Sequence, residues 1–133
     1  FLKGVGDGTF TALGTATPEF NGVRGVRLGD TDGDGDLDLA VSAWSDVRWN
    51  TFVNNGSGAF AGRTSYNVGA AAFDLYLEDL DGDGDLDLVN VKGDNLRGDG
   101  VGAFSSFAFS ASINPIWSQG SAIADYNGAG DLD

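Results

Sequence analysis

A ten-residue acidic string occurs twice in this chain and constrains its fold more than any other feature. It runs from Asp30 to Leu39 as DTDGDGDLDL and returns forty-nine residues later, from Asp79 to Leu88, as DLDGDGDLDL. A shorter relative, DYNGAGDLD, follows after forty-six more residues, at 125–133. Three copies at nearly constant spacing indicate a repeat protein whose unit is built around this loop.

The alternating aspartates indicate a site for a hard metal ion. Five carboxylates in one short loop would repel one another strongly unless a cation lay between them. Loop positions one, three, five and nine offer carboxylate oxygens and position seven offers a backbone carbonyl, which suits calcium. Glycine at position six can adopt the positive φ that folds the backbone around an ion. The predicted ligands are Asp30, Asp32, Asp34, Asp36 and Asp38 in the first loop and Asp79, Asp81, Asp83, Asp85 and Asp87 in the second.

The third loop has a poorer set of ligands. Asn127 replaces an aspartate with a neutral oxygen donor, and Ala129 removes the ligand at position five. The donors that remain are Asp125, the backbone carbonyl of Asp131, and Asp133. We expect two strong calcium sites in the chain and a third that is weak or empty.

Other metals and another loop family fit less well. Magnesium demands tight octahedral geometry and releases its waters reluctantly. Zinc and copper prefer nitrogen and sulfur ligands, and the chain has no His and no Cys. An EF-hand requires flanking helices and a Glu at position twelve, where the two intact loops have Val41 and Asn90. A solvated Asp-Gly turn without an ion is the simpler alternative, mainly for the third loop.

The distribution of charge supports the same view. The three loops hold thirteen of the twenty acidic residues, and the other seven match the seven Lys and Arg, so the net charge of −13 resides in the loops. The few basic residues are scattered, which argues against a nucleic-acid partner. No apolar run is long enough to span a membrane. Loops of this type fill at millimolar calcium, which favours an extracellular or cell-surface location.

The spacing of turns and apolar runs predicts an all-β fold. Each repeat shows four short strands, with the acidic loop joining the first two in antiparallel order. A second motif, GDGTF at 6–10, GSGAF at 56–60 and GVGAF at 100–104, marks the turn between the third and fourth strands, and its phenylalanine is expected to anchor that turn to the core. Four strands in 40 to 50 residues are typical of a β-propeller blade. The predicted strands are 23–29, 37–44, 48–54 and 63–68 in one repeat and 72–78, 86–92, 95–97 and 105–110 in the next.

These acidic loops, followed at a fixed distance by NNGSGAF at 54–60, resemble FG-GAP or VCBS-type repeats. Such repeats occur in the propeller of integrin α subunits, in some fungal lectins and in large bacterial surface or secreted proteins. The resemblance covers essentially the whole chain and implies a calcium-binding β-propeller whose loops rigidify each blade. It fixes no ligand, because the family serves adhesion, sugar binding and accessory roles in enzymes.

The repeat boundaries predict one repeat domain over 1–133. It comprises a half-blade at 1–20, full blades at 21–69 and 70–118, and the start of a further blade at 119–133. An ordinary closed propeller has more blades. We therefore expect either further blades from the same parent chain, giving a partial propeller here, or a ring completed by a homo-oligomer.

The function predicted from these features is recognition or adhesion rather than catalysis. The chain has no His, no Cys and no recognisable nucleophile, so an enzyme is not expected. Trp49, among polar neighbours, is the best candidate for stacking on a sugar, followed by Trp44. A glycan or a surface protein is thus the predicted partner. The alternatives are a calcium-stiffened structural spacer or assembly unit and, less favoured, an accessory domain of a secreted enzyme.

Overall fold

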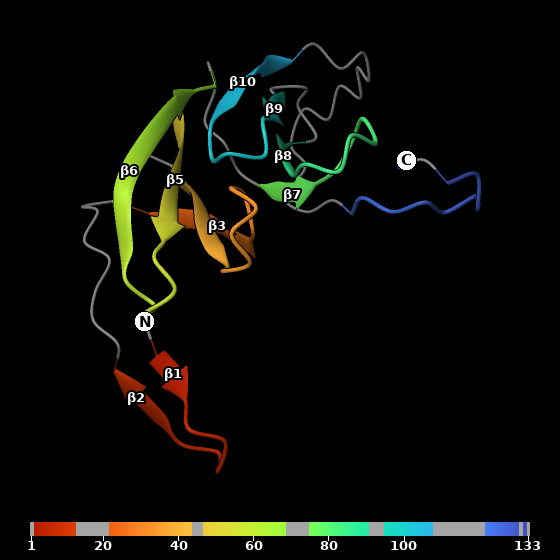
Figure 1. Cartoon of the computed structure of the whole chain (residues 1–133). Coiled ribbons are helices and arrows are strands. Elements are labelled where there is room, and N and C mark those ends of the chain that lie inside the picture. Colours follow the sequence, from red (N-terminus) through yellow and green to blue (C-terminus); the bar gives the residue numbers. More distant parts are fainter. Residues whose placement is uncertain are drawn as a thin grey trace.

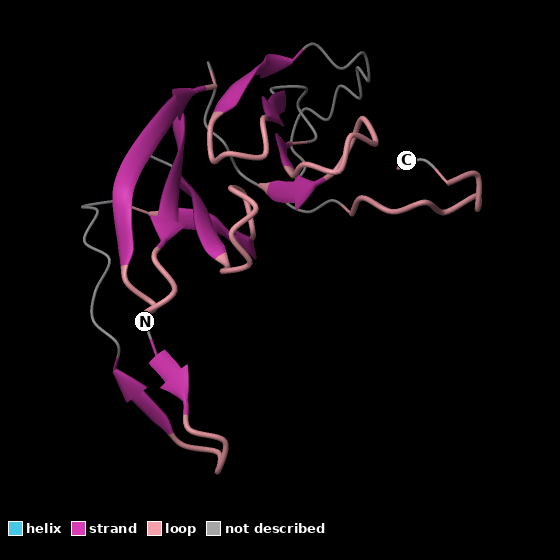
Figure 2. Cartoon of the chain, in the orientation of Figure 1, coloured by secondary structure: helices cyan, strands magenta, loops and turns pink. Residues whose placement is uncertain are grey.

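The computed structural model describes residues 2–12, 22–43, 47–68, 75–90, 95–107, 122–130 and 132. Within these ranges every regular element is a β-strand (Figures 1 and 2). The strands form a two-stranded sheet and two four-stranded sheets, and all strand pairs are antiparallel. For the described residues, the prediction of an all-β fold is confirmed.

The first four-stranded sheet is a simple meander in the order β3-β4-β5-β6. Its strands are β3 (Val23–Gly29), β4 (Asp38–Ala43), β5 (Arg48–Asn54) and β6 (Phe60–Asn67). The bounds of β3 and β5 are those predicted. β6 begins three residues earlier than predicted, because Phe60 already pairs with Asn54 directly across the glycine turn. The first acidic loop joins β3 to β4, as the sequence indicated.

The second four-stranded sheet repeats this order with shorter strands. They are β7 (Tyr76–Glu78), β8 (Asp87–Val89), β9 (Asn95–Gly98) and β10 (Phe104–Phe107). The second acidic loop joins β7 to β8. Residues 72–74, 91–92 and 108–110, which were predicted to extend these strands, lie outside the described part of the chain. Leu75, Leu86 and Asn90 were also predicted to belong to these strands, but they lie just beyond the ends of β7 and β8. The four-stranded units match the prediction, whereas their arrangement as propeller blades stays a prediction.

The glycine turn has one geometry wherever it occurs. In each turn the backbone N–H of the residue before the motif donates to the carbonyl of the motif's fourth residue, at 3.0 to 3.3 Å. The first and third residues are glycines with positive φ in all three turns. The turns join β5 to β6, β9 to β10, and the isolated strands β1 (Leu2–Gly4) and β2 (Phe10–Ala12). The motif predicted from sequence is therefore a true hairpin turn.

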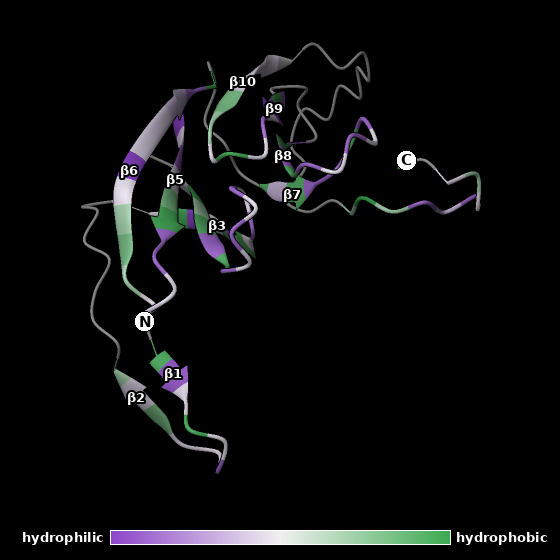
Figure 3. Ribbon diagram, viewed as in Figure 1, coloured by the Kyte–Doolittle hydropathy of each residue, from purple (hydrophilic) through white to green (hydrophobic). Residues whose placement is uncertain are grey.

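The main core lies where the two four-stranded sheets meet. Its buried residues come from both sheets, and Tyr66 and Phe104 meet edge to face with ring centroids 5.5 Å apart. Figure 3 shows hydrophobic positions along the strands and a mostly hydrophilic loop after β3. Phe104 and the partly buried Phe60 anchor their turns as predicted, whereas Phe10 is 65% exposed. The buried members of this core are Ala40, Trp49, Val68, Leu75, Leu77, Leu88, Leu96 and Phe104.

The position of Trp49 corrects a prediction. The side chain is fully buried in this core, with 0% of its surface exposed, so no face of the indole is available to a sugar. Polar neighbours in sequence were misleading here because alternate residues of a strand point to opposite faces. Trp44 lies outside the described residues.

Candidate metal centres in the acidic loops

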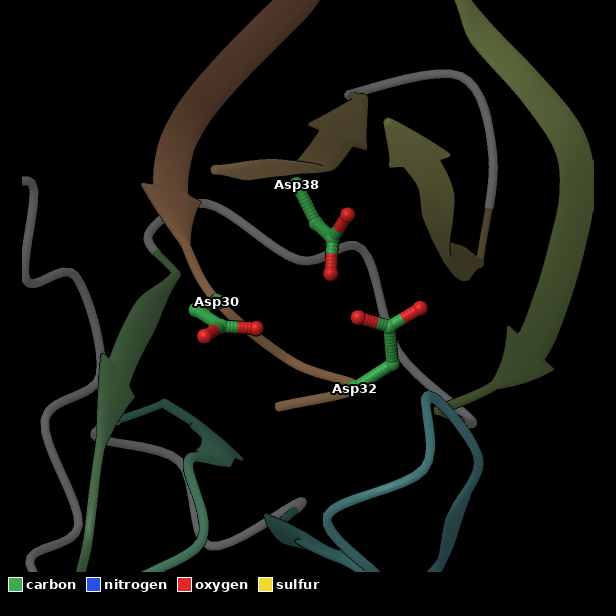
Figure 4. Close-up of side chains that lie close together, drawn as sticks. All are labelled: Asp30, Asp32 and Asp38. Carbon is green, nitrogen blue, oxygen red and sulfur yellow. The ribbon is translucent and has the colours of Figure 1, made fainter. Parts of the chain in front are cut away.

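The first acidic loop brings three of its five aspartates together. Asp30, Asp32 and Asp38 each offer one carboxylate oxygen, and these oxygens lie within 4.8 Å of one another. Figure 4 shows the three side chains around a common space, with Asp38 at the start of β4 and the others on the preceding loop. Asp34 is not part of this group. The carboxylate of Asp36 instead lies against the glycine turn of the same sheet.

The backbone of this loop is shaped by its first aspartate. One carboxylate oxygen of Asp30 accepts a hydrogen bond from Gly33 N at 2.8 Å, and the other accepts one from Gly35 N at 2.9 Å. Both glycines have positive φ, 75° and 90°. The prediction for the glycine at position six is confirmed. Position four, occupied by Gly33, also requires a positive φ, and this was not predicted. The repeated Gly-Asp-Gly string could have indicated it.

Asp38, at position nine, does more than offer an oxygen to a metal. It is fully buried and accepts hydrogen bonds from Thr31 N at 2.9 Å, Thr31 Oγ1 at 2.5 Å and Asn54 N at 2.8 Å. These bonds fasten the loop to the end of β5. Sequence reasoning identified Asp38 only as a ligand, since the contribution of Asn54 depends on strand pairing.

The second loop has the same backbone frame, but its converging carboxylates come from a different set of loop positions. Asp79, Asp81 and Asp83 are the three whose oxygens converge within 4.8 Å. Asp79 accepts from Gly82 N at 2.8 Å and Gly84 N at 2.9 Å, just as Asp30 does in the first loop. The predicted ligand Asp85 lies against a turn glycine, as Asp36 does.

Asp87 takes the place of Asp38. It is buried and accepts from Leu80 N and Gly98 N, each at 2.9 Å. Burial raises the pKa of the Asp87 carboxyl above its ordinary value, and the two backbone hydrogen bonds oppose this rise. The position-nine carboxylate therefore fastens each loop to the third strand of its sheet.

The largest electrostatic difference between the loops comes from Arg97 on β9. Its Nε lies 2.9 Å from Asp81 Oδ2, and its Nη2 lies 2.5 Å from Asp83 Oδ2. The hydrogen bond from Arg97 holds the pKa of the Asp83 carboxyl below its ordinary value. Sequence reasoning missed Arg97, because only the pairing of β8 with β9 brings it to the loop.

In the first loop the pKa of Asp32 moves in the opposite direction. Partial burial raises the pKa of this carboxyl, and the negative charges of neighbouring loop aspartates raise it further. Within the described ranges, no Lys or Arg forms an ion pair with the carboxylates of this loop. The repulsion expected from the sequence is thus visible in the first loop and partly neutralised in the second.

The third loop keeps the backbone frame. Asp125 accepts from Gly128 N at 2.6 Å and Gly130 N at 2.8 Å, and Gly130 has the positive φ predicted for position six. The Asn127 side-chain oxygen accepts from Ala129 N at 2.7 Å. The remaining predicted ligands, Asp131 and Asp133, lie outside the described residues, so the weaker third site stays a prediction.

The first loop also contacts the second sheet. Gly102 N, in the β9–β10 turn, donates a 3.0 Å hydrogen bond to the backbone carbonyl of Thr31. A Cβ at Gly102 would lie 3.3 Å from the Cβ of Asp32, so the two backbones approach closely. The first candidate metal centre therefore lies at the boundary between the two sheets.

Comparison with known proteins agrees with the motif. Residues 30–89, which include both intact acidic loops, match the family model described as an FG-GAP-like repeat. This confirms the resemblance predicted from the sequence over that segment, and such a repeat suggests a β-propeller-type repeat module. No curated protein and no solved structure matches the chain. A search of the described segments finds no helix able to span a membrane.

Proposed function

We propose that this chain is a calcium-stabilised β-propeller-type module that works outside the cell in binding or adhesion. The observation that carries the proposal is the convergence of three carboxylates in each of the two intact loops. Supporting evidence comes from the FG-GAP-like match, which covers both loops. The proposal assigns the acidity of the chain to metal binding rather than to catalysis.

Calcium is the ion that best fits the donors. The groups that converge are all carboxylates, and loops of this kind satisfy several long calcium–oxygen bonds more easily than the short octahedral ones of magnesium. The residues that would hold the ion are Asp30, Asp32 and Asp38 in the first loop and Asp79, Asp81 and Asp83 in the second. Bound calcium would supply positive charge that offsets their repulsion.

The structural consequence of binding would be a stiffer connection between strands. The Asp38 carboxylate already joins the loop to β5 through Asn54 N, and Thr31 in the same loop accepts the hydrogen bond from the second sheet. An ion in the first loop would therefore strengthen one sheet and its packing on the next. Because such loops fill at about millimolar calcium, we place the module outside the cell.

Partner recognition divides the proposal into two forms. In the first form the module recognises a partner, and in the second it is an assembly unit. Glycan recognition is weakened because Trp49, the best candidate for stacking on a sugar, is buried. A surface protein remains a suitable partner. The alternative, a spacer or assembly unit stiffened by calcium, is favoured by the contact between the first loop and the adjacent sheet.

Thermal unfolding in calcium and in EDTA tests the metal assignment. Calcium should raise the midpoint, because a ligand at a hundredfold excess over its dissociation constant stabilises the folded state by about 2.7 kcal/mol per site. Asp32→Asn and Asp81→Asn should each reduce this gain while keeping a side-chain oxygen at the loop. Asp7→Asn is the matched control, because it removes the same charge from a turn that is not part of either set of converging carboxylates. Equal midpoints in calcium and EDTA would contradict the proposal.

A glycan-array screen with calcium and with EDTA, combined with light scattering, separates the two forms. Calcium-dependent binding to a defined sugar would support the recognition form. Calcium-dependent oligomers without sugar binding would support the assembly form.

A further inference from the structure

Arg97 lies across the second loop as an internal counter-ion. Its guanidinium contacts Asp81 and Asp83, two of the three carboxylates that would hold calcium there. The Arg97 side chain is 45% exposed and those of Asp81 and Asp83 are 20% and 29% exposed, so the pair is only partly screened by water. A guanidinium stays charged at any physiological pH, so the positive charge at this position is permanent.

The first sheet has a neutral residue at the equivalent place. Gly98 N binds the carboxylate of Asp87 as Asn54 N binds that of Asp38, which aligns Arg97 with Val53. Val53 is half-buried and carries no charge. The two loops therefore share a backbone frame and differ in whether the third strand delivers a cation.

We propose that Arg97 lowers the calcium affinity of the second loop and holds that loop together when calcium is absent. The inference rests on the proposed calcium function. Calcium entering this loop must either displace the guanidinium from two carboxylates or bind beside a fixed positive charge, and both oppose binding. Among the described residues no such competitor lies at the first loop, so that loop fills at lower calcium and depends more on the ion. The module then responds to calcium in two steps.

A reciprocal exchange of the two aligned residues tests this. Arg97→Val should raise the calcium affinity of the second loop about two- to fivefold, the range set by partly exposed ion pairs, and leave the first loop unchanged. Val53→Arg should lower the affinity of the first loop by a similar factor. Arg97→Lys, which keeps the charge but loses the two-pronged contact, should raise the affinity of the second loop less than Arg97→Val.

Each loop can be followed separately in a two-dimensional NMR calcium titration. The backbone amides of Gly35 and Gly84 donate to the first aspartate of their own loops, so each peak reports one site. If Arg97→Val unfolds in EDTA, the affinity is measured on the calcium-loaded variant by competition with a chelator. Unchanged or weaker calcium binding by the second loop of Arg97→Val would overturn the inference and make Arg97 a residue that positions the carboxylates.

The outcomes also separate this inference from the proposed function. If neither glycine peak of the unmodified chain responds to calcium, the proposed function fails. If both peaks respond and Arg97→Val leaves the second loop's affinity unchanged, only the role of Arg97 fails.

Discussion

The acidic loops at 30–39 and 79–88 differ at one position, Thr31 against Leu80, and yet they have different electrostatic surroundings. In the first, the Thr31 hydroxyl adds a hydrogen bond to the buried Asp38, and the pKa of Asp32 is raised. In the second, Arg97 reaches in from β9, and the pKa of Asp83 is lowered. The comparison teaches that the properties of such a loop depend on the strand beside it as much as on its own sequence.

The backbone frame common to both loops is held by hydrogen bonds from backbone amides to two aspartates. Neither the Thr31 hydroxyl nor Arg97 takes part in these bonds. The first aspartate accepts from two glycine amides, and the ninth accepts from the second loop residue and from the end of the third strand. These carboxylates order the loop backbone through hydrogen bonds that need no bound ion. We therefore expect the frame to be the more sensitive target for mutation and the ligands at positions three and five to be the more tolerant.

The largest effect is expected from Asp38→Asn, which should lower the free energy of unfolding by about 3 kcal/mol in calcium-free buffer. An amide nitrogen at this buried site would face a donor and leave it without an acceptor. Asp87→Asn should cost about 1 kcal/mol less, because Asp87 lacks the hydroxyl partner that Thr31 gives Asp38. Urea denaturation measures both.

Asp34→Asn, at an exposed position, serves as the control for this pair. Thr31→Val should make the costs of Asp38→Asn and Asp87→Asn equal, since it removes the hydroxyl that distinguishes them. Equal costs in the chain with Thr31 present would show that the hydroxyl contributes nothing.

A smaller effect is expected at the glycine turn that supports the first loop. Gly56→Ala should cost about 1–2 kcal/mol, because Gly56 has a φ of 77° and an added Cβ would lie 2.6 Å from Asp36 Oδ2. Gly62→Ala is the matched control, with a φ of 68° and open space around the added Cβ. It should show only the backbone cost. Gly56→Ala alone should also weaken calcium binding in the first loop, because Asp36, whose backbone carbonyl is a predicted ligand, has to move. Titration calorimetry beside urea denaturation detects both effects, and identical behaviour of the two variants would contradict the role of Asp36.

The smallest effect concerns pH in the absence of calcium. The pKa of Asp83 is lowered in the folded state, so Asp83 stabilises the fold at pH values above its ordinary pKa of 3.8. This contribution is lost as the pH falls through the lower folded-state pKa. Asp32, whose pKa is raised, has the opposite sign and opposes folding once the pH rises through its folded-state value. Carboxyl-carbon NMR titration should place the pKa of Asp83 below that of Asp32. Arg97→Val should raise the pKa of Asp83 and leave that of Asp32 unchanged. A pKa of Asp83 that does not respond to Arg97→Val would remove the electrostatic basis of the comparison.

Much of the fold follows from local sequence. The bounds of β3 and β5, the glycine turns and the positive φ at position six depend on residues a few positions apart, and all were predicted. The early start of β6 was not, because it follows from the register that the turn imposes on the hairpin. Of the predicted site residues, three in each intact loop converge, and position nine proved to be a buried fastening point.

The sequence by itself determined that this chain is an all-β repeat protein with aspartate-rich loops, because turn chemistry and alternating carboxylates act over a few bonds. Only the tertiary structure decided that Trp49 is buried, that Arg97 pairs with two carboxylates of the second loop and that Gly102 contacts the first loop. These facts depend on strand pairing and on the packing of one sheet against another. Such contacts join residues far apart in the chain, and neither composition nor spacing specifies them.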